Sequence, residues 1–171
     1  MKKIAILLLI IVISCGKSEK TKPIIKKENY TSGSGKKAMW DLYFPDTVFI
    51  GELYNGKIIY KGILDTITTS FDDKTKERYI VAVLGVSNQL NIDKSILLEI
   101  AKDTFGAVNY RTIPFYDIKF TKLGKNYIHG YINDHVIIDT ITKPTKANDK
   151  VRYIENVITV NCNVYVKEKN K

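Results

Sequence analysis

The chain has 171 residues and a formal net charge of +9, from 27 lysines and arginines against 18 aspartates and glutamates. Such a positive charge is common in proteins that bind nucleic acid, but its distribution argues against that class. Residues 16–37 hold seven lysines and two glutamates, a net of +5, whereas residues 38–171 hold 18 bases and 16 acids, a net of +2. We therefore expect no nucleic-acid partner and one nearly neutral domain of about 130 residues.

The N-terminus combines a basic start with a short apolar run. Lys2 and Lys3 precede ten consecutive apolar residues, 4–13. That run is about half of the roughly 20 residues that a membrane-spanning helix needs. A basic start, a short apolar segment and a small residue at its end are typical of a secretory signal peptide.

The end of this segment, VISC at residues 12–15, resembles the lipobox of bacterial lipoproteins. The resemblance covers residues 1–15 only. It implies that the signal peptide, residues 1–14, is removed, that Cys15 carries two acyl chains on its sulfur, and that its new amino group is a further site for a chain such as palmitate. The alternative is an uncleaved anchor, or an ordinary signal peptide with a chance cysteine.

Lipid on Cys15 would hold the exported protein at a membrane of the cell envelope, because two acyl chains give stable anchoring. Gly16 follows, where an aspartate would signal inner-membrane retention in some Gram-negative bacteria. We therefore expect attachment to the outer membrane, with the periplasmic and surface-facing leaflets both open.

Residues 15–37 are predicted to be the lipidated cysteine and a flexible basic tether. They include Pro23 and the TSGSG run at 31–35, a composition typical of linkers. The tether would hold the domain, residues 38–171, away from the membrane. Alternatively, its lysines contact anionic head groups.

Beyond residue 38, alternating apolar residues predict strands. In VITVNCNVYV, residues 157–166, every second residue from Ile158 to Val166 lies on one apolar face. Cys162 belongs to that face, so we expect a small buried side chain and not a nucleophile or metal ligand. The segment 91–106 breaks the pattern and predicts a short helix, with Asp93 as N-cap and Gly106 as the stop.

An internal repeat relates two parts of the domain. Residues 64–86 align without gaps on residues 138–160 and are identical at ten of 23 positions, including the DTIT and RYI blocks. The shared spacing favours a duplication, although chance similarity between threonine-rich strands is the alternative.

Each repeat unit is predicted to be a long β-hairpin. The arms would bring together Asp65 with Arg78 in one unit and Asp139 with Arg152 in the other, as exposed pairs that contribute about 0–1 kcal/mol. The alternative is that all four side chains lie in water.

Together these features predict a mainly β fold. We expect a single β-sandwich, built from the two related hairpin units with one short helix between them. LGKNYIHGYI, residues 123–132, faintly resembles the tyrosine corner of immunoglobulin-like sandwiches, with Tyr127 following Gly124, although it lacks the usual acidic residue and the inter-sheet disulfide.

No pattern of residues points to an active site. His129 and His135 are six residues apart, roughly 20 Å along a continuous strand, which is too far to share one metal ion. A turn at Asp134 is the alternative that would bring them together. Nucleophile elbows, phosphate-binding glycine loops and EF-hand loops are not found in the sequence. We expect no enzymatic activity, no metal site and no cofactor.

The function predicted from the sequence is that of a membrane-anchored lipoprotein whose sandwich is a non-enzymatic binding module for another envelope protein. The alternative is an inhibitor or immunity-type lipoprotein that blocks a secreted enzyme or toxin. An envelope enzyme is less favoured. The sequence leaves the oligomeric state open.

Overall fold

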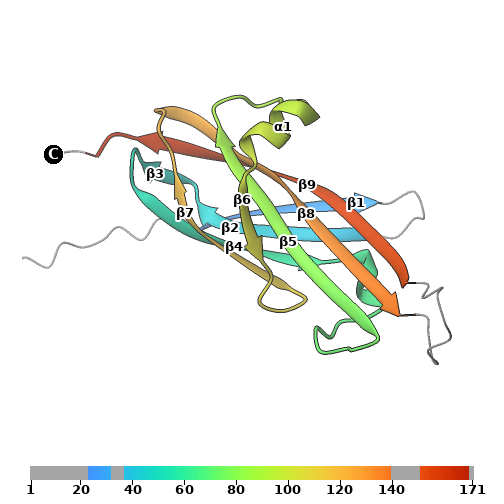
Figure 1. Cartoon of the computed structure of the whole chain (residues 1–171). Coiled ribbons are helices and arrows are strands. Elements are labelled where there is room, and N and C mark those ends of the chain that lie inside the picture. The colour runs from blue at the N-terminus through green and yellow to red at the C-terminus, as the bar shows by residue number, and fades with distance from the viewer. Residues whose placement is uncertain (1–22, 32–36, 140–150, 170–171) are drawn as a thin grey trace, which may run out of the picture.

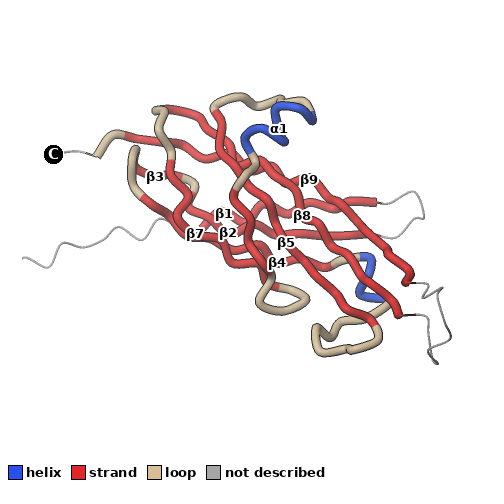
Figure 2. Tube along the Cα trace, viewed as in Figure 1, coloured by secondary structure: helices blue, strands red, loops and turns tan. Residues whose placement is uncertain are grey.

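The computed structural model describes residues 23–31, 37–139 and 151–169, which form a mainly β structure with two sheets (Figure 1). Sheet A has the order β1 (Pro23–Thr31), β2 (Lys37–Pro45), β4 (Leu53–Lys61) and β7 (Thr112–Lys119). Sheet B has the order β3 (Thr47–Phe49), β9 (Val151–Lys167), β8 (Gly124–Asp139), β5 (Lys76–Ser87) and β6 (Asp103–Gly106). The helical elements in this part of the chain are η1 (Ile63–Thr66) and α1 (Lys94–Ile100), drawn in blue in Figure 2.

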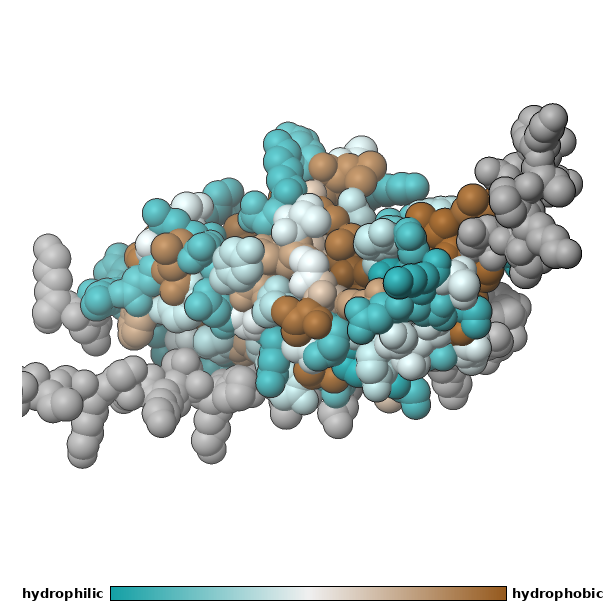
Figure 3. Space-filling model, turned by 60° about the horizontal axis from the view of Figure 1, so that its bottom comes forward, coloured by the Kyte–Doolittle hydropathy of each residue, from teal (hydrophilic) through white to brown (hydrophobic). Residues whose placement is uncertain are grey.

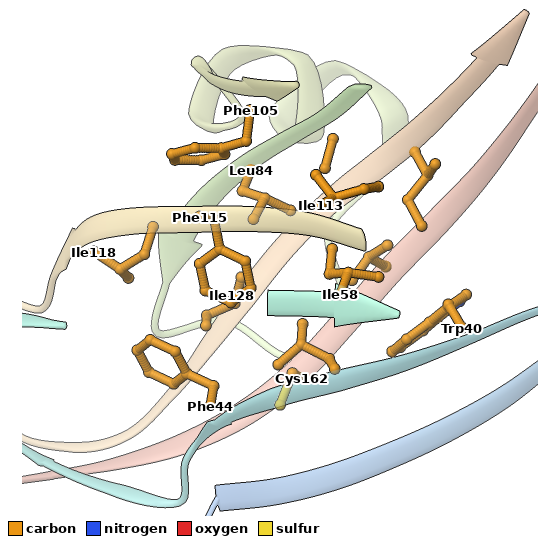
Figure 4. Close-up of a cluster of buried hydrophobic side chains, with 14 of the residues drawn as sticks. Trp40, Phe44, Ile58, Leu84, Phe105, Ile113, Phe115, Ile118, Ile128 and Cys162 are labelled. Atoms are coloured by element: carbon orange, nitrogen blue, oxygen red, sulfur yellow. The ribbon is translucent and has the colours of Figure 1, made fainter. Parts of the chain in front are cut away.

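The core lies between the two sheets, and sheet B curls strongly around it (Figure 1). Trp40 and Phe44 from sheet A face Ile128 and Cys162 from sheet B, as Figure 4 shows. Such contacts follow from the period of two in a strand, which places alternate side chains on the same face. No helix in the described part of the chain is both long enough and apolar enough to cross a bilayer.

The alternation predicted for residues 157–166 is confirmed. Ile158, Val160, Cys162, Val164 and Val166 are buried. Val157 and Tyr165, on the opposite face, are about half exposed. Cys162 is fully buried, and its sulfur lies 3.7 Å from the carbonyl oxygen of Asn163.

β1 lies inside residues 15–37, the segment expected to be the lipidated cysteine and flexible tether, so strand pairing begins before the expected boundary at residue 38. β1 pairs with β2 over its whole length, from Pro23 opposite Pro45 to Thr31 opposite Lys37. The lysines in residues 23–31 suggested a solvated tether, but these residues form a strand. The Gly/Ser run that suggested a linker lies between the two paired strands β1 and β2. Residues 16–22, with three lysines and one glutamate, then lie between Cys15 and the first described strand.

Only one of the two expected hairpin units forms. β8 and β9 pair antiparallel from Gly124 opposite Val166 to Asp139 opposite Val151, so residues 138–160 belong to a long hairpin. Residues 64–86 do not form a hairpin, because η1 carries the chain from β4 in sheet A to β5 in sheet B. The DTIT block is thus partly a 3-10 turn in the first unit, while the RYI block lies near the start of a strand in both.

The predicted short helix is confirmed as α1. The Asp93 side chain caps it by accepting a hydrogen bond from the backbone N–H of Ile96 at 2.9 Å. The helix ends at Ile100 and not near Gly106, which belongs to β6. It connects β5 to β6 within one sheet, and it packs closely on β5: a Cβ atom placed on Gly85 would lie 2.1 Å from the carbonyl oxygen of Ile100.

Candidate functional site

The candidate site begins with a buried ion pair between two strands of sheet B. Arg78 on β5 donates from Nε to Asp134 Oδ1 at 2.9 Å and from Nη2 to Asp134 Oδ2 at 2.8 Å. Both side chains are fully buried. Burial alone would lower the pKa of Arg78, but the carboxylates of Asp134 and Asp65 raise it, so the guanidinium stays charged. The two parallel hydrogen bonds fix the orientation of both groups.

Tyr60 joins this ion pair to the opposite sheet. Its hydroxyl, on β4 of sheet A, donates to Asp134 Oδ2 at 2.9 Å and accepts from Asn156 Nδ2 at 3.4 Å. Burial, and then the charge of Asp134, raise the pKa of Tyr60 well above its ordinary value. The phenol therefore remains a neutral donor, and it holds the two sheets together at this point.

Arg78 also holds the loops next to the ion pair. Its Nη1 donates to the carbonyl oxygen of Thr68 and lies 2.8 Å from Asp65 Oδ1. Asp65 in turn pairs with Arg111, which lies in the connection between β6 and β7. One buried guanidinium thus holds residues 62–75 directly and residues 107–111 through Asp65. We call these two segments the loop cluster.

The outer part of the loop cluster is ordered by its own hydrogen bonds. Asp73 accepts from the backbone N–H of Thr75 at 3.0 Å and from its hydroxyl at 2.8 Å. These bonds lower the pKa of Asp73. Such an Asx turn presents the neighbouring residues in one conformation.

A groove of about 580 Å³ lies between the loop cluster and the edge of β5. Its walls are residues 71–74 on one side and Gly106 and Ala107 on the other, and residues 77–81 of β5 form its floor. Phe71 and Tyr79 line the groove and are 38% and 48% exposed. Consecutive residues of β5, which point to opposite faces of the sheet, all line the groove. It therefore follows the edge of the strand.

A row of aromatic rings extends from the groove across the outer face of sheet B. Tyr79 on β5 stacks on His135 of β8, with ring centroids 5.1 Å apart, and His135 lies 5.5 Å from the ring of Tyr153 on β9. Tyr153 is 55% exposed. Hydrophobic residues, brown in Figure 3, lie in patches among hydrophilic ones on the face brought forward there. Exposed aromatic side chains of this kind are enriched in binding surfaces.

Of the two charged pairs predicted from the sequence, the structure shows one in contact. Asp65 and Arg78 are in contact, but the Arg78 side chain is fully buried and that of Asp65 is only 12% exposed, instead of the exposed pair that was expected. Arg152 is opposite Ile138 in the β8–β9 register, whereas Asp139 is opposite Val151. Cys15 lies outside the described residues.

The two histidines lie on one continuous strand, β8, without the turn at Asp134 that could have brought them together. His129 is buried, with Nε2 2.9 Å from the carbonyl oxygen of Gln89. His135 belongs to the aromatic row. Within the described ranges, no three histidine, cysteine or carboxylate side chains are grouped as a metal site.

Asp134 and Tyr60 were missed as partners of Arg78. A signal existed for Asp134, because it falls on the core-facing side of β8 between the buried residues Ile132 and Val136. A carboxylate at such a position is almost always paired. Tyr60 gave no such signal, since a tyrosine is ordinary in a strand and its partner is 74 residues away.

No protein-family model, curated protein or solved structure matches the chain.

Proposed function

We propose that this chain is a lipid-anchored lipoprotein of the bacterial cell envelope whose β domain is a non-enzymatic binding module. The observation that carries the binding function is the groove beside the loop cluster, with exposed Phe71 and Tyr79 on a rigid support. Binding sites gain affinity when their residues are held in place before the partner arrives. The buried Arg78 supplies that rigidity.

The use of the charged groups supports binding over catalysis. The side chains of Arg78, Asp134 and Tyr60 satisfy one another inside the core, where they stabilise the loops and are buried away from solvent. A catalytic acid or base needs a substrate within hydrogen-bond distance. The carboxylates that line the groove are the exposed Asp72 and Glu77 and the turn residue Asp73.

The fold is part of the proposal, as an immunoglobulin-like sandwich. The strand order supports it: β2, β4 and β7 would take the places of strands A, B and E, and β9, β8, β5 and β6 those of G, F, C and C′. The loop cluster would then correspond to the end at which immunoglobulin variable domains carry binding loops. Tyr127 lies near the start of the strand equivalent to F.

The lipid anchor rests on the lipobox resemblance of residues 12–15. Cys15→Ala should leave an unprocessed precursor that takes up no labelled palmitate, while Cys162→Ala should be labelled like the wild type. Normal processing and labelling of the Cys15 variant would contradict the anchor.

The binding function is tested by affinity capture. Lipidated chain, purified from its native envelope under mild conditions, should retain one stoichiometric protein. Tyr79→Ala should weaken that retention, whereas Tyr165→Ala, equally exposed at the other end of sheet B, should not. Failure to retain any protein would count against a binding module.

An inhibitor or immunity-type lipoprotein is the second candidate. The aromatic row and the groove form the aromatic patch that such a protein needs for a single tight partner. It differs from a general binding module in one measurable way: the captured protein would be a secreted enzyme or toxin that loses its activity when bound.

A further inference from the structure

An unpaired stretch of β5 forms the floor of the groove. β5 begins at Lys76, but its pairing with β6 extends only from Val81 to Leu84. On that side, residues 76–80 have no strand partner in the described part of the chain, although loop residues bond to both ends: Lys76 N–H donates to Asp73 O, and Ile80 O accepts from Ala107 N–H. Such an edge can accept a further strand by backbone hydrogen bonds.

The direction of the peptide groups on this edge can be worked out. Ala107 N–H donates to Ile80 O at 2.9 Å, so the peptide groups of Ile80 point toward the groove. Peptide groups of alternate residues point to the same side of a strand, so the backbone N–H and C=O of Arg78 also face it. The buried side chain of Arg78 holds this backbone in place, which lowers the entropy that binding would lose.

The exposed charge of the groove is negative. Asp72, Asp73 and Glu77 line it, with Lys74 as the opposing exposed base. The charge of Arg78 is already neutralised inside by Asp134 and Asp65. The remaining lining side chains carry a formal net charge of −2, in a chain of net charge +9.

The aromatic residues of the groove also favour a positively charged ligand. Phe71 and Tyr79 line it beside these carboxylates. Aromatic faces attract lysine and arginine side chains, and carboxylates next to them add to that attraction. A lysine of an incoming strand could therefore contact a ring and a carboxylate together.

We propose that the groove binds an extended, lysine-rich segment of a partner protein, which adds as a strand to β5 in line with β6. Strand addition supplies the affinity mainly through the backbone N–H and C=O of Arg78, because the C=O of Ile80 already accepts from Ala107, and the carboxylates select a basic partner. The inference rests on the proposed function, since it names the class of partner that the binding module takes.

The test uses the full chain and synthetic peptides. A capped seven-residue peptide of alternating lysine and valine should bind in calorimetry at physiological salt, and should slow hydrogen exchange in residues 76–81. Two control peptides should not bind: one with glutamate in place of each lysine, and one with alternate amides N-methylated. The first reverses the charge of the side chains, and the second removes the backbone donors needed for strand addition.

Variants of the chain test whether the lysine peptide binds in the groove. Asp72→Asn with Glu77→Gln should weaken the lysine peptide about tenfold, equivalent to about 1.4 kcal/mol, whereas Glu99→Gln on the distant surface of α1 should not change it. Gly106→Lys should abolish binding. A side chain at Gly106 meets no atom within 4 Å, so this variant should fold normally and yet occupy the groove with a competing cation.

The outcomes separate this inference from the proposed function. Equal binding of the lysine and glutamate peptides, binding of the N-methylated peptide, or undiminished binding to Gly106→Lys would each overturn the inference. So would a native partner that binds Gly106→Lys as tightly as the wild type, although the module would then still bind a partner by another surface. Absence of any native partner would count against the proposed function itself.

Discussion

Replacement of the buried arginine by an apolar residue of similar length, Arg78→Met, should destabilise the protein severely. The change removes both hydrogen bonds to Asp134, the bond to Thr68 and the contact with Asp65. Asp134 would remain fully buried, with Tyr60 as its remaining hydrogen-bond donor among those described above. Breaking a buried ion pair by removing one partner costs about 3–5 kcal/mol, a large part of the 5–15 kcal/mol that holds a typical domain together.

Urea denaturation of the full chain, followed by circular dichroism, measures this loss. With an m-value of about 2 kcal/mol per molar urea, the midpoint should fall by roughly 2 M. Arg152→Met is the matched control: Arg152 is exposed on β9, and surface changes of this kind stay within about 0.5 kcal/mol. Hydrogen exchange should also speed up in residues 62–75, because Arg78 holds that segment.

A double variant decides whether the loss comes from the uncompensated carboxylate. Arg78→Met with Asp134→Leu removes both charges, and apolar replacement of a complete buried pair is often neutral or stabilising. The double variant should therefore be more stable than Arg78→Met alone. A loss below about 1 kcal/mol for Arg78→Met, or additive losses in the double variant, would refute the reasoning.

Three further predictions follow from buried groups. The folded state keeps the proton on Tyr60, whereas the unfolded phenol loses it with a pKa of about 10; wild-type stability in urea should therefore decline as pH rises above 10, by at most about 1.4 kcal/mol per pH unit, and Tyr60→Phe should show a shallower decline. An equal slope in both proteins would contradict the assignment. The Cys162 thiol should resist an aqueous alkylating reagent until urea is added, and rapid labelling of the native protein would contradict its burial. Gly85→Ala should displace α1 from β5, visible as faster hydrogen exchange in residues 94–101, and unchanged exchange there would show that the backbones can separate without cost.

The parts of the fold that could be predicted are those encoded locally. The alternation at 157–166 shows which face is buried, and the Asp93 side chain caps α1 from three residues away. The contact between Asp65 and Arg78 was predicted too, but for a hairpin that does not form. It arises because η1 turns the chain between the sheets and brings the two side chains together.

The rest depended on contacts between distant segments. Residues 23–31 look like a linker by composition, and they form β1 because β2, which pairs with β4 on one side, offers its other edge to them. The groove was not predictable, since it requires β6 to stop pairing at Val81 while β5 continues to Lys76. Neither end point has a local signal in the sequence.

The central claim is that the chain binds a partner at the groove beside the loop cluster, and site-specific photo-cross-linking tests it most directly. The lipidated chain would carry p-benzoylphenylalanine in place of Phe71 in the groove or, as a control, in place of Tyr165 at the far end of sheet B. Irradiation in the native envelope should give one discrete cross-linked protein from position 71 and none from position 165. No product from position 71, or the same products from both positions, would contradict a binding site at the groove.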